Sequence, residues 1–228
     1  MGKKQFFLIV DTETTMAGTV ADFGAVIVDR HGEIFAECGV MVKGEFMEKE
    51  LFHDAKSSAA IWTLDGLKRR NEAYTKMLNE GSRMLASVAA INRWLEKVAA
   101  KYNPELTAYN LAFDLDKCQK TGIDLSLFAN RFCLWHAASS TICKTKEYKT
   151  FALANRFMTE KLNIQTNAEG VSAFVTGNMI EEPHTALEDA KHHERHILVA
   201  LLKKNKWREK MTAYSWRDWQ AKDHFVAK

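Results

Sequence analysis

The chain has 228 residues, a formal net charge of +3 and 46% hydrophobic residues, which fits one covered core and is short for two. It has two prolines, no apolar run near the ~20 residues of a membrane span, and four cysteines without paired spacing. These features argue against a disordered linker, a membrane-spanning protein, a disulfide scaffold and a cysteine zinc site, and we expect a cytoplasmic location.

The first predicted element is a buried strand over Phe6–Asp11, whose apolar side chains would fill both faces of a covered sheet. Asp11 and Glu13 lie two residues apart at its end, so on extended backbone they project from the same face. Two like charges side by side on a core strand repel each other and resist desolvation unless a cation offsets them. The pair therefore indicates a cation site.

Two more strands and a long helix are expected next. Ala21–Asp29 and Ile34–Val42 are rich in apolar and β-branched residues, and Arg30–Glu33 predicts a hairpin turn between them. Helical spacing follows from Arg83 to Ala100. One apolar stripe of this helix is expected to face the core, and it comprises Met84, Val88, Ile91, Leu95 and Val98.

A second acidic motif follows the short predicted strand Leu106–Tyr109. Asn110 suits the N-cap of a helix that continues through Leu115–Thr121, which places Asp114 in its first turn. Asp116 lies about 200° around the helix from Asp114, so both cannot face one site. Asp114 is therefore the candidate metal ligand, held at the end of a strand.

A third motif opens the predicted closing helix, Thr185–Lys203. Thr185 and Glu188 have the spacing of a capping box, which gives Glu188 a structural role. His184 then lies on a loop just outside the helix, where we expect a mobile imidazole, and Asp189 offers a fixed carboxylate in the first turns. An imidazole with a pKa near 6.5 is suited to act as a general base close to neutral pH.

The element order predicts an α/β fold with a mixed sheet and helices on both faces. Three antiparallel strands come first, and parallel strands follow, with Arg131–His136 as the fifth strand. This is the pattern of a ribonuclease-H-like domain, which we expect to span residues 1–202. A later run, His192–His196, lacks the spacing of a zinc protease motif. His192 and His196 share a helix face, which we expect to be solvated.

Together the three motifs resemble those of the DnaQ-like 3′–5′ exonucleases, in the DEDDh subgroup with three aspartates, one glutamate and a histidine. The matching residues are Asp11-Thr12-Glu13-Thr14-Thr15, Asn110 to Asp114, and His184 with Asp189 five positions later. Stretches at Asn163–Glu169, Gly177-Asn178 and Glu181–His184 are also similar to stand-alone phage and bacterial members. The resemblance covers roughly residues 5–44 and 104–202, and it leaves residues 45–80 as an atypical insertion.

The resemblance implies a metal-dependent 3′–5′ exonuclease, a phosphodiester hydrolase acting on single-stranded 3′ ends in a bacterial or phage-infected cell. Asp11 would bridge two Mg²⁺ or Mn²⁺ ions, which prefer carboxylate oxygens. Glu13 and Asp189 would hold the ion that binds the attacking water, and Asp114 would hold the other. His184 would take the proton from that water. Thr14, Phe113 and Asn110 are the implied contacts to the terminal nucleotide.

Three functions compete on the sequence alone. DNA is the favoured substrate of the exonuclease, and an exoribonuclease that trims RNA ends or oligoribonucleotides is the alternative. The sequence does not separate DNA from RNA, because the contacts that discriminate between them are made to the 2′-position of the sugar. The third is a non-catalytic nucleic-acid-binding or polymerase-associated module, against which the retention of all five site residues counts. A homodimer and a partner in replication or repair stay open.

The last 26 residues form a basic and aromatic extension, 203–228. It holds eight Lys or Arg against three Asp or Glu. Its aromatic residues are Trp207, Tyr214, Trp216, Trp219 and Phe225. Basic residues among aromatics suit single-stranded nucleic acid. We favour packing of these rings on the domain, because three exposed tryptophans are costly.

Overall fold

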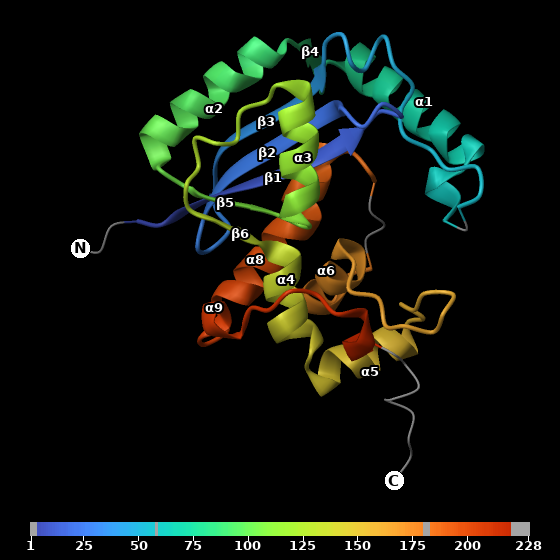
Figure 1. Ribbon diagram of the computed structural model, residues 1–228, viewed down its shortest axis with the longest axis vertical. Helices are drawn as coiled ribbons and strands as arrows, with labels where there is room; N and C mark the ends of the chain where they lie inside the picture. The colour runs from blue at the N-terminus through green and yellow to red at the C-terminus, as the bar shows by residue number, and fades with distance from the viewer. Residues whose placement is uncertain (1–3, 58, 180–182, 220–228) are drawn as a thin grey trace.

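A six-stranded mixed sheet forms the centre of this computed structural model, with the strand order β4-β3-β2-β1-β5-β6 (Figure 1). The structure describes residues 4–57, 59–179 and 183–219. Phe225 of the basic extension lies outside the described residues, and so do Glu181 and Glu182 of the stretch that resembles the exonuclease family. Among the helices that are described, none is long and apolar enough to cross a membrane.

The sheet combines an antiparallel meander with parallel strands. Its strands are β1 (Phe6–Thr14), β2 (Val20–Asp29), β3 (Ile34–Val42), β4 (Met84–Ala86), β5 (Glu105–Ala108) and β6 (Arg131–Cys133). β2 pairs antiparallel with β1 and with β3, whereas the pairs β1–β5, β5–β6 and β3–β4 are parallel. The predicted order of antiparallel strands followed by parallel ones is confirmed, and so is the α/β class.

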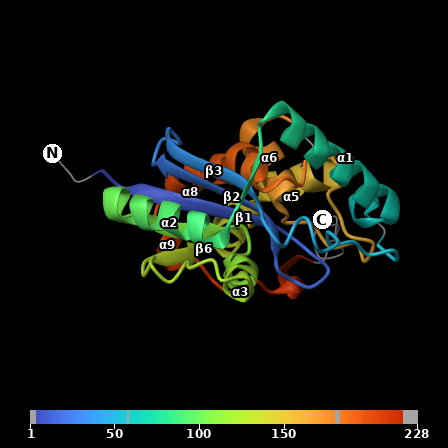
Figure 2. The ribbon, with the colours of Figure 1, turned by 90° about the horizontal axis from the view of Figure 1, so that it is seen from above.

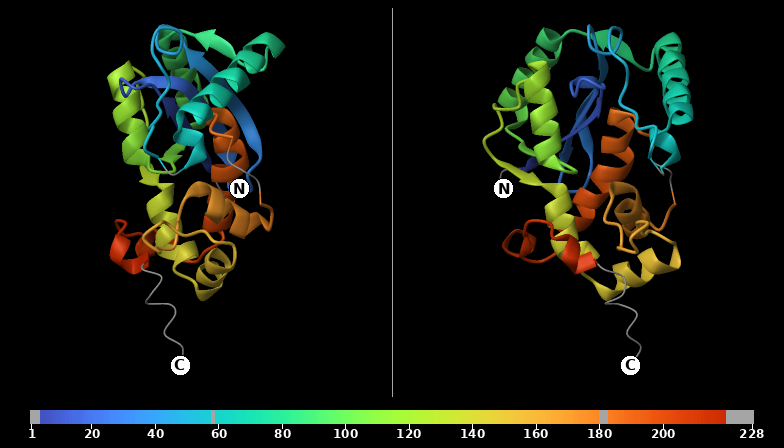
Figure 3. Two further views of the ribbon diagram at one scale, coloured as in Figure 1. Left: turned by 90° about the vertical axis from the view of Figure 1, so that its right-hand side faces the viewer. Right: turned by 45° about the vertical axis from the view of Figure 1, so that its right-hand side comes forward.

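Helices cover both faces of the sheet, because the central strands are apolar on both. Phe7 and Ile9 of β1 face one core, with the helices α4, α5, α6 and α8, while Leu8 and Val10 face a second core beneath α2 and α3. Figure 3 shows the strands between these two helix layers. The main helices are α1 (Leu64–Glu80), α2 (Val88–Tyr102), α3 (Leu111–Thr121), α4 (Leu134–Ala138), α5 (Lys146–Ala154), α6 (Ala168–Thr176), α7 (Ala186–Asp189), α8 (Arg195–Leu202) and α9 (Trp207–Lys210).

The helix predicted over Arg83–Ala100 starts later than expected, so this prediction was wrong at its N-terminal end. Met84–Ala86 instead form β4, paired with β3, and Met84 is 64% exposed rather than part of the buried stripe. Ser87 caps α2 by accepting the backbone N–H of Ala90, which fixes where the helix begins. Periodicity alone does not reveal the pairing with a strand more than 40 residues earlier.

Two other boundaries differ from the sequence interpretation. Arg131–His136 is a strand only as far as Cys133, and the chain then turns into α4. The closing helix is continuous over residues 186–202, but a π-helical turn at Ala190–Glu194 (η3) separates α7 from α8. This wider turn changes which side chains share a face, and it matters at the site described below.

The C-terminal extension packs against the core around α4 in the described part of the chain. Trp207 is 8% exposed and Trp219 only 1%, and Tyr214 stacks on Trp135 with ring centroids 4.4 Å apart. Arg208 adds a bidentate ion pair with Glu105, with contacts of 2.7 and 2.6 Å. The buried rings therefore serve packing.

The atypical segment 45–80 lies at the carboxyl end of β1. Leu51 forms an antiparallel bridge with Thr15, and the backbone N–H of Phe52 donates to the carbonyl of Thr14 at 2.8 Å. A short 3₁₀ turn, Ala60–Trp62 (η1), then leads into α1. Figure 2 shows α1 at the opposite end of the sheet from the N-terminus. The segment is thus placed beside the end of the strand that carries Asp11 and Glu13.

Candidate metal centre and active site

The four predicted carboxylates are brought together from three separate parts of the chain. Asp11 and Glu13 lie on β1, Asp114 lies in the first turn of α3, and Asp189 ends α7. The pKa of Asp11 is raised well above its usual range, first by burial and then by the charges of other carboxylates, Asp189, Asp114 and Glu13 among them. Each of these carboxylates is therefore near enough to Asp11 for its charge to disfavour ionisation of Asp11.

Glu13, His184 and Asp189 form the tightest part of this cluster. One ligand atom from each residue lies within 4.8 Å of the other two. His184 Nδ1 is 3.9 Å from Glu13 Oε1. The predicted base thus stands directly beside one predicted metal ligand.

Thr12 holds the carboxylate of Asp114. The Thr12 hydroxyl donates to Asp114 Oδ1 at 2.8 Å. Burial raises the pKa of Asp114 to about 7, although the hydrogen bond from Thr12 acts in the other direction. Asn110 occupies the predicted N-cap position with a left-handed φ of 84°, but its side chain caps no backbone N–H of the described residues. The helix starts at Leu111, where expected, without the expected cap.

His184 is more firmly held than a free loop residue. Its ring packs on that of Trp62, with centroids 4.8 Å apart, and its carbonyl oxygen lies 3.4 Å from the Tyr74 hydroxyl. Burial, and then the electrostatic effects of Arg70 and His193, lower its pKa to about 4. The imidazole is therefore neutral and able to accept a proton at neutral pH, and it packs against Trp62.

The capping box predicted at the start of α7 is also replaced by other contacts. Thr185 occupies the N-cap position, but its hydroxyl donates to the Glu188 carboxylate at 2.7 Å. Glu188 in turn forms an ion pair with buried Arg83. The N–H of Ala186 is satisfied from another strand, because it donates to Asp22 Oδ2 at 3.0 Å. The first backbone N–H of α7 is thus bound by the carboxylate of Asp22, which is distant in sequence, and not by a local capping residue.

Gly24 allows α7 to approach the sheet this closely. In β2 it pairs with Asp11 of β1, and a Cβ atom at this position would lie 2.2 Å from the carbonyl carbon of Ala186. Only a residue without a side chain fits there. The segment that carries His184 and Asp189 can therefore pack directly against the backbone of β2 at Gly24, close to the carboxylates of β1.

Glu194 is a fifth carboxylate at the site, which the sequence analysis missed. It is 2% exposed, and the backbone N–H of Tyr109 donates to its Oε1 at 3.1 Å. Its charge is the largest carboxylate contribution to the raised pKa of Asp11. In a regular α-helix, Glu194 would lie about 140° around from Asp189, and the π-helical turn between them brings it back towards the site.

The predicted substrate contacts divide into accessible and buried residues. Phe113 is 42% exposed, and the Lys117 ammonium lies 5.0 Å from its ring centroid. Asn110 is exposed as well, whereas Thr14 is buried in the sheet. Asp116 faces solvent and pairs with lysines, as expected for a residue outside the site.

The donor set fits hard divalent cations. Carboxylate oxygens are the ligands that Mg²⁺ and Mn²⁺ prefer, and the cluster contains no thiolate among its described members. Desolvated carboxylates that raise one another's pKa are stabilised when a cation offsets their charge. Asp11, Glu13, Asp114 and Asp189 are the residues able to hold such ions.

Comparison with models of known protein families finds no match to this chain, and comparison with curated proteins finds none either. Function is therefore inferred from the chemistry of the site.

Proposed function

We propose that the protein is a metal-dependent 3′–5′ exonuclease that hydrolyses phosphodiester bonds at the 3′ ends of single-stranded nucleic acid, with DNA as the favoured substrate. The observation that carries the proposal is the convergence of Glu13, His184 and Asp189, with ligand atoms within 4.8 Å of one another. A proton acceptor beside clustered carboxylates is the equipment that metal-assisted hydrolysis requires.

We further propose that the fold is ribonuclease-H-like. The three-stranded antiparallel meander, the parallel strands beyond β1 and the helices on both faces support this assignment. The carboxylates lie where β1 ends, where α3 begins and in α7, so the topology itself gathers them. Catalytic groups at the carboxyl ends of strands are common in α/β domains.

The proposed mechanism assigns a separate task to each group. Asp11, Glu13, Asp114 and Asp189 would hold two Mg²⁺ or Mn²⁺ ions. When bound, such ions activate water and stabilise the negative charge that develops during phosphodiester hydrolysis. His184 accepts a proton from the attacking water through its neutral imidazole. Glu13, 3.9 Å from Nδ1, then stabilises the resulting imidazolium.

Phe113 and Lys117 support nucleic acid as the substrate. An exposed aromatic ring with an ammonium 5.0 Å from its centroid offers base stacking and phosphate attraction together. Both residues lie on α3, with Phe113 one residue before Asp114 and Lys117 three residues after it. A strand that stacks on Phe113 would therefore be close to the carboxylates.

The proposal is tested by digesting 5′-labelled single-stranded DNA and RNA of equal sequence with Mg²⁺, with Mn²⁺ and with a chelator. We expect a ladder of products shortened from the 3′ end, dependent on the metal and faster on DNA. A phosphorothioate linkage at the 3′ terminus should slow its appearance. Faster digestion of RNA would select the exoribonuclease, and binding without any cleavage would select the non-catalytic module.

A further inference from the structure

Aromatic and charged residues of the segment 45–80 pack beside His184. The Trp62 ring packs on the imidazole with centroids 4.8 Å apart and an interplanar angle of 59°. Arg70 lies over the same indole, 4.8 Å from its centroid, and donates through Nη2 to the carbonyl of Phe52. Phe52 also packs edge-on against Trp62 at 5.7 Å. The indole behind the imidazole is thus itself fixed by two neighbours.

The backbone at His184 is held in an unusual conformation. Its φ is +52°, in the left-handed region that side-chain-bearing residues rarely adopt. Such conformations persist where surrounding contacts impose them, and they are concentrated at functional sites. The contacts that flank this peptide therefore decide where the imidazole points.

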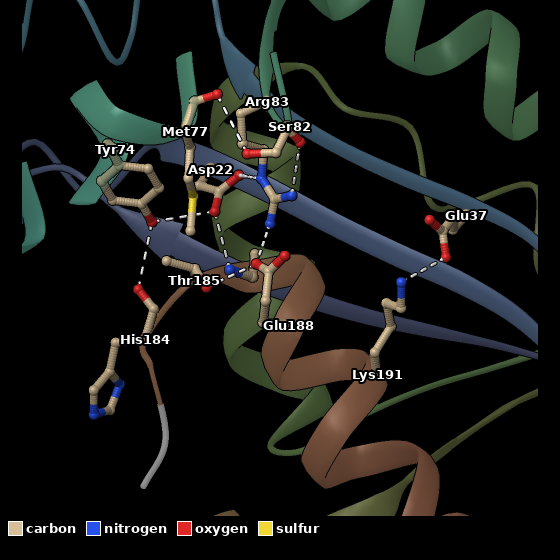
Figure 4. Close-up of polar contacts among 11 residues, drawn as sticks. Asp22, Glu37, Tyr74, Met77, Ser82, Arg83, His184, Thr185, Glu188 and Lys191 are labelled. Carbon is tan, nitrogen blue, oxygen red and sulfur yellow. Dashed lines mark hydrogen bonds and ion pairs between the residues drawn. The ribbon is translucent and has the colours of Figure 1, made fainter. Parts of the chain in front are cut away.

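Tyr74 and Asp22 supply those flanking contacts (Figure 4). The Tyr74 hydroxyl lies 3.4 Å from the carbonyl oxygen of His184 and 3.1 Å from Asp22 Oδ2. The same Asp22 oxygen accepts the N–H of Ala186 at 3.0 Å. The backbone from His184 to Ala186 is thereby bracketed by one buried tyrosine and one buried aspartate.

Arg83 ties Asp22 to the helix that carries Asp189. Its Nε lies 3.6 Å from Asp22 Oδ1, and its Nη2 donates to Glu188 of α7. Asp22, Tyr74 and Arg83 are all buried, so solvent competes little for these bonds. The network links α1 and the loop after it to the start of α7.

We propose that Tyr74 and Trp62 are positioning residues for His184, so that the segment that carries these two side chains contributes to the active site. The inference rests on the proposed hydrolytic function, in which His184 is the base. Trp62 fixes the plane of the imidazole, and Tyr74 fixes the peptide from which it projects. Neither Trp62 nor Tyr74 is one of the proposed metal ligands.

The test compares Tyr74→Phe and Trp62→Leu, each made in the wild-type chain and in a His184→Ala background. Both variants should lower kcat by about 10- to 100-fold with little change in KM, because a misplaced base slows chemistry more than binding. In the His184→Ala background the same substitutions should have almost no effect on kcat. Tyr74 and Trp62 would act through His184, so their effects and that of His184 are not additive. Mn²⁺ affinity, followed by calorimetry, should stay unchanged.

Tyr102→Phe is the matched control. It removes a hydroxyl that donates to a backbone carbonyl, that of Phe35 at 3.2 Å, at the end of α2 and the start of β3, which carry none of the proposed site residues. We expect kcat to be unaffected. Trp62 is half-buried, so Trp62→Leu provides a folded variant even if Tyr74→Phe, which leaves Asp22 with one donor fewer, unfolds.

The outcomes separate this inference from the proposed function. Equal losses of kcat in both backgrounds, or no loss in either, would overturn the positioning role while leaving the hydrolase intact. A wild-type chain without metal-dependent cleavage would overturn the function instead. Histidine NMR then still decides the positioning role. The ring signal that is absent in His184→Ala should shift in Tyr74→Phe, which leaves the Trp62 ring in place, and an unmoved signal would contradict the role.

Discussion

Asp114 shows at the residue scale how the site depends on a cation. Its carboxylate is buried, with a pKa raised to about 7 from the 3.8 of an unperturbed aspartate. Between about pH 4 and pH 7, the folded, metal-free protein therefore keeps a proton on Asp114 that the unfolded chain has lost. The free energy of unfolding is therefore highest below pH 4 and falls as the pH rises to 7, by an amount on the order of 4 kcal/mol.

Replacing Asp114 with Asn should remove that loss of stability and abolish cleavage. In urea unfolding with a chelator at pH 8, Asp114→Asn should be more stable than the wild-type chain, and its stability should vary less between pH 4 and 7. Asp116→Asn, on the exposed side of the same helix, should retain cleavage. Near-normal turnover of folded Asp114→Asn would contradict its role as a metal ligand.

His184 should govern the rate without governing metal binding. His184→Ala is expected to lower kcat by about 10²–10⁴-fold, the usual range for a positioned base. Because burial and nearby positive charges lower its pKa to about 4, its imidazole loses its proton well below pH 6.5. The rate of the intact enzyme should therefore rise with a midpoint near pH 4. A pH–rate profile that stays the same in His184→Ala would assign the base role elsewhere.

At the scale of elements, the close packing of α7 on β2 decides whether His184 and Asp189 lie near the carboxylates of β1. Gly24→Ala would place a Cβ 2.2 Å from the backbone of Ala186, which cannot move aside without displacing α7. We expect a loss of at least about 10²-fold in kcat, because small displacements of catalytic groups are costly. Gly39→Ala, on the neighbouring strand, meets mainly the Leu187 side chain and should cost less. Equal activities of the two variants would contradict this account.

Local sequence predicted the elements that depend on local patterns. The apolar runs of β1 to β3 and the stripe of Ile91, Leu95 and Val98 are where they were expected. β4 was missed because its pairing with β3 is non-local. Helix caps were predicted at Asn110 and Thr185 from residue type, but the folded chain satisfies the N–H of Ala186 through Asp22, which no local pattern indicates.

The site shows the same division. Asp11, Glu13, Asp114, His184 and Asp189 were all found by spacing and motif, and the structure brings them together. Glu194 was missed because a π-helical turn alters the helical phase after Asp189. Tyr74 was missed because the segment 45–80 has no recognisable motif, and its role follows only from contacts more than 100 residues apart in sequence.

At the scale of the whole molecule, the basic extension contributes to stability through its buried rings. Trp219 is 1% exposed, and its backbone carbonyl accepts the N–H of Ile164. Trp219→Ala should lower the unfolding free energy by about 3–5 kcal/mol, measured by chemical denaturation. Trp219→Phe, which keeps a ring for the stack with Tyr214, should cost less. The salt dependence of DNA binding should be unchanged in both, and a flatter dependence would instead indicate a phosphate contact.

The central claim is that the clustered carboxylates support metal-dependent hydrolysis from the 3′ end. The most direct measurement is a time course on 5′-labelled single-stranded DNA with Mg²⁺, comparing the wild-type chain with folded Asp11→Asn. The account predicts progressive shortening from the 3′ end by the wild-type chain, complete arrest by chelator, and no products from the variant. Products that form with the chelator present, or in equal amount with Asp11→Asn, would contradict it.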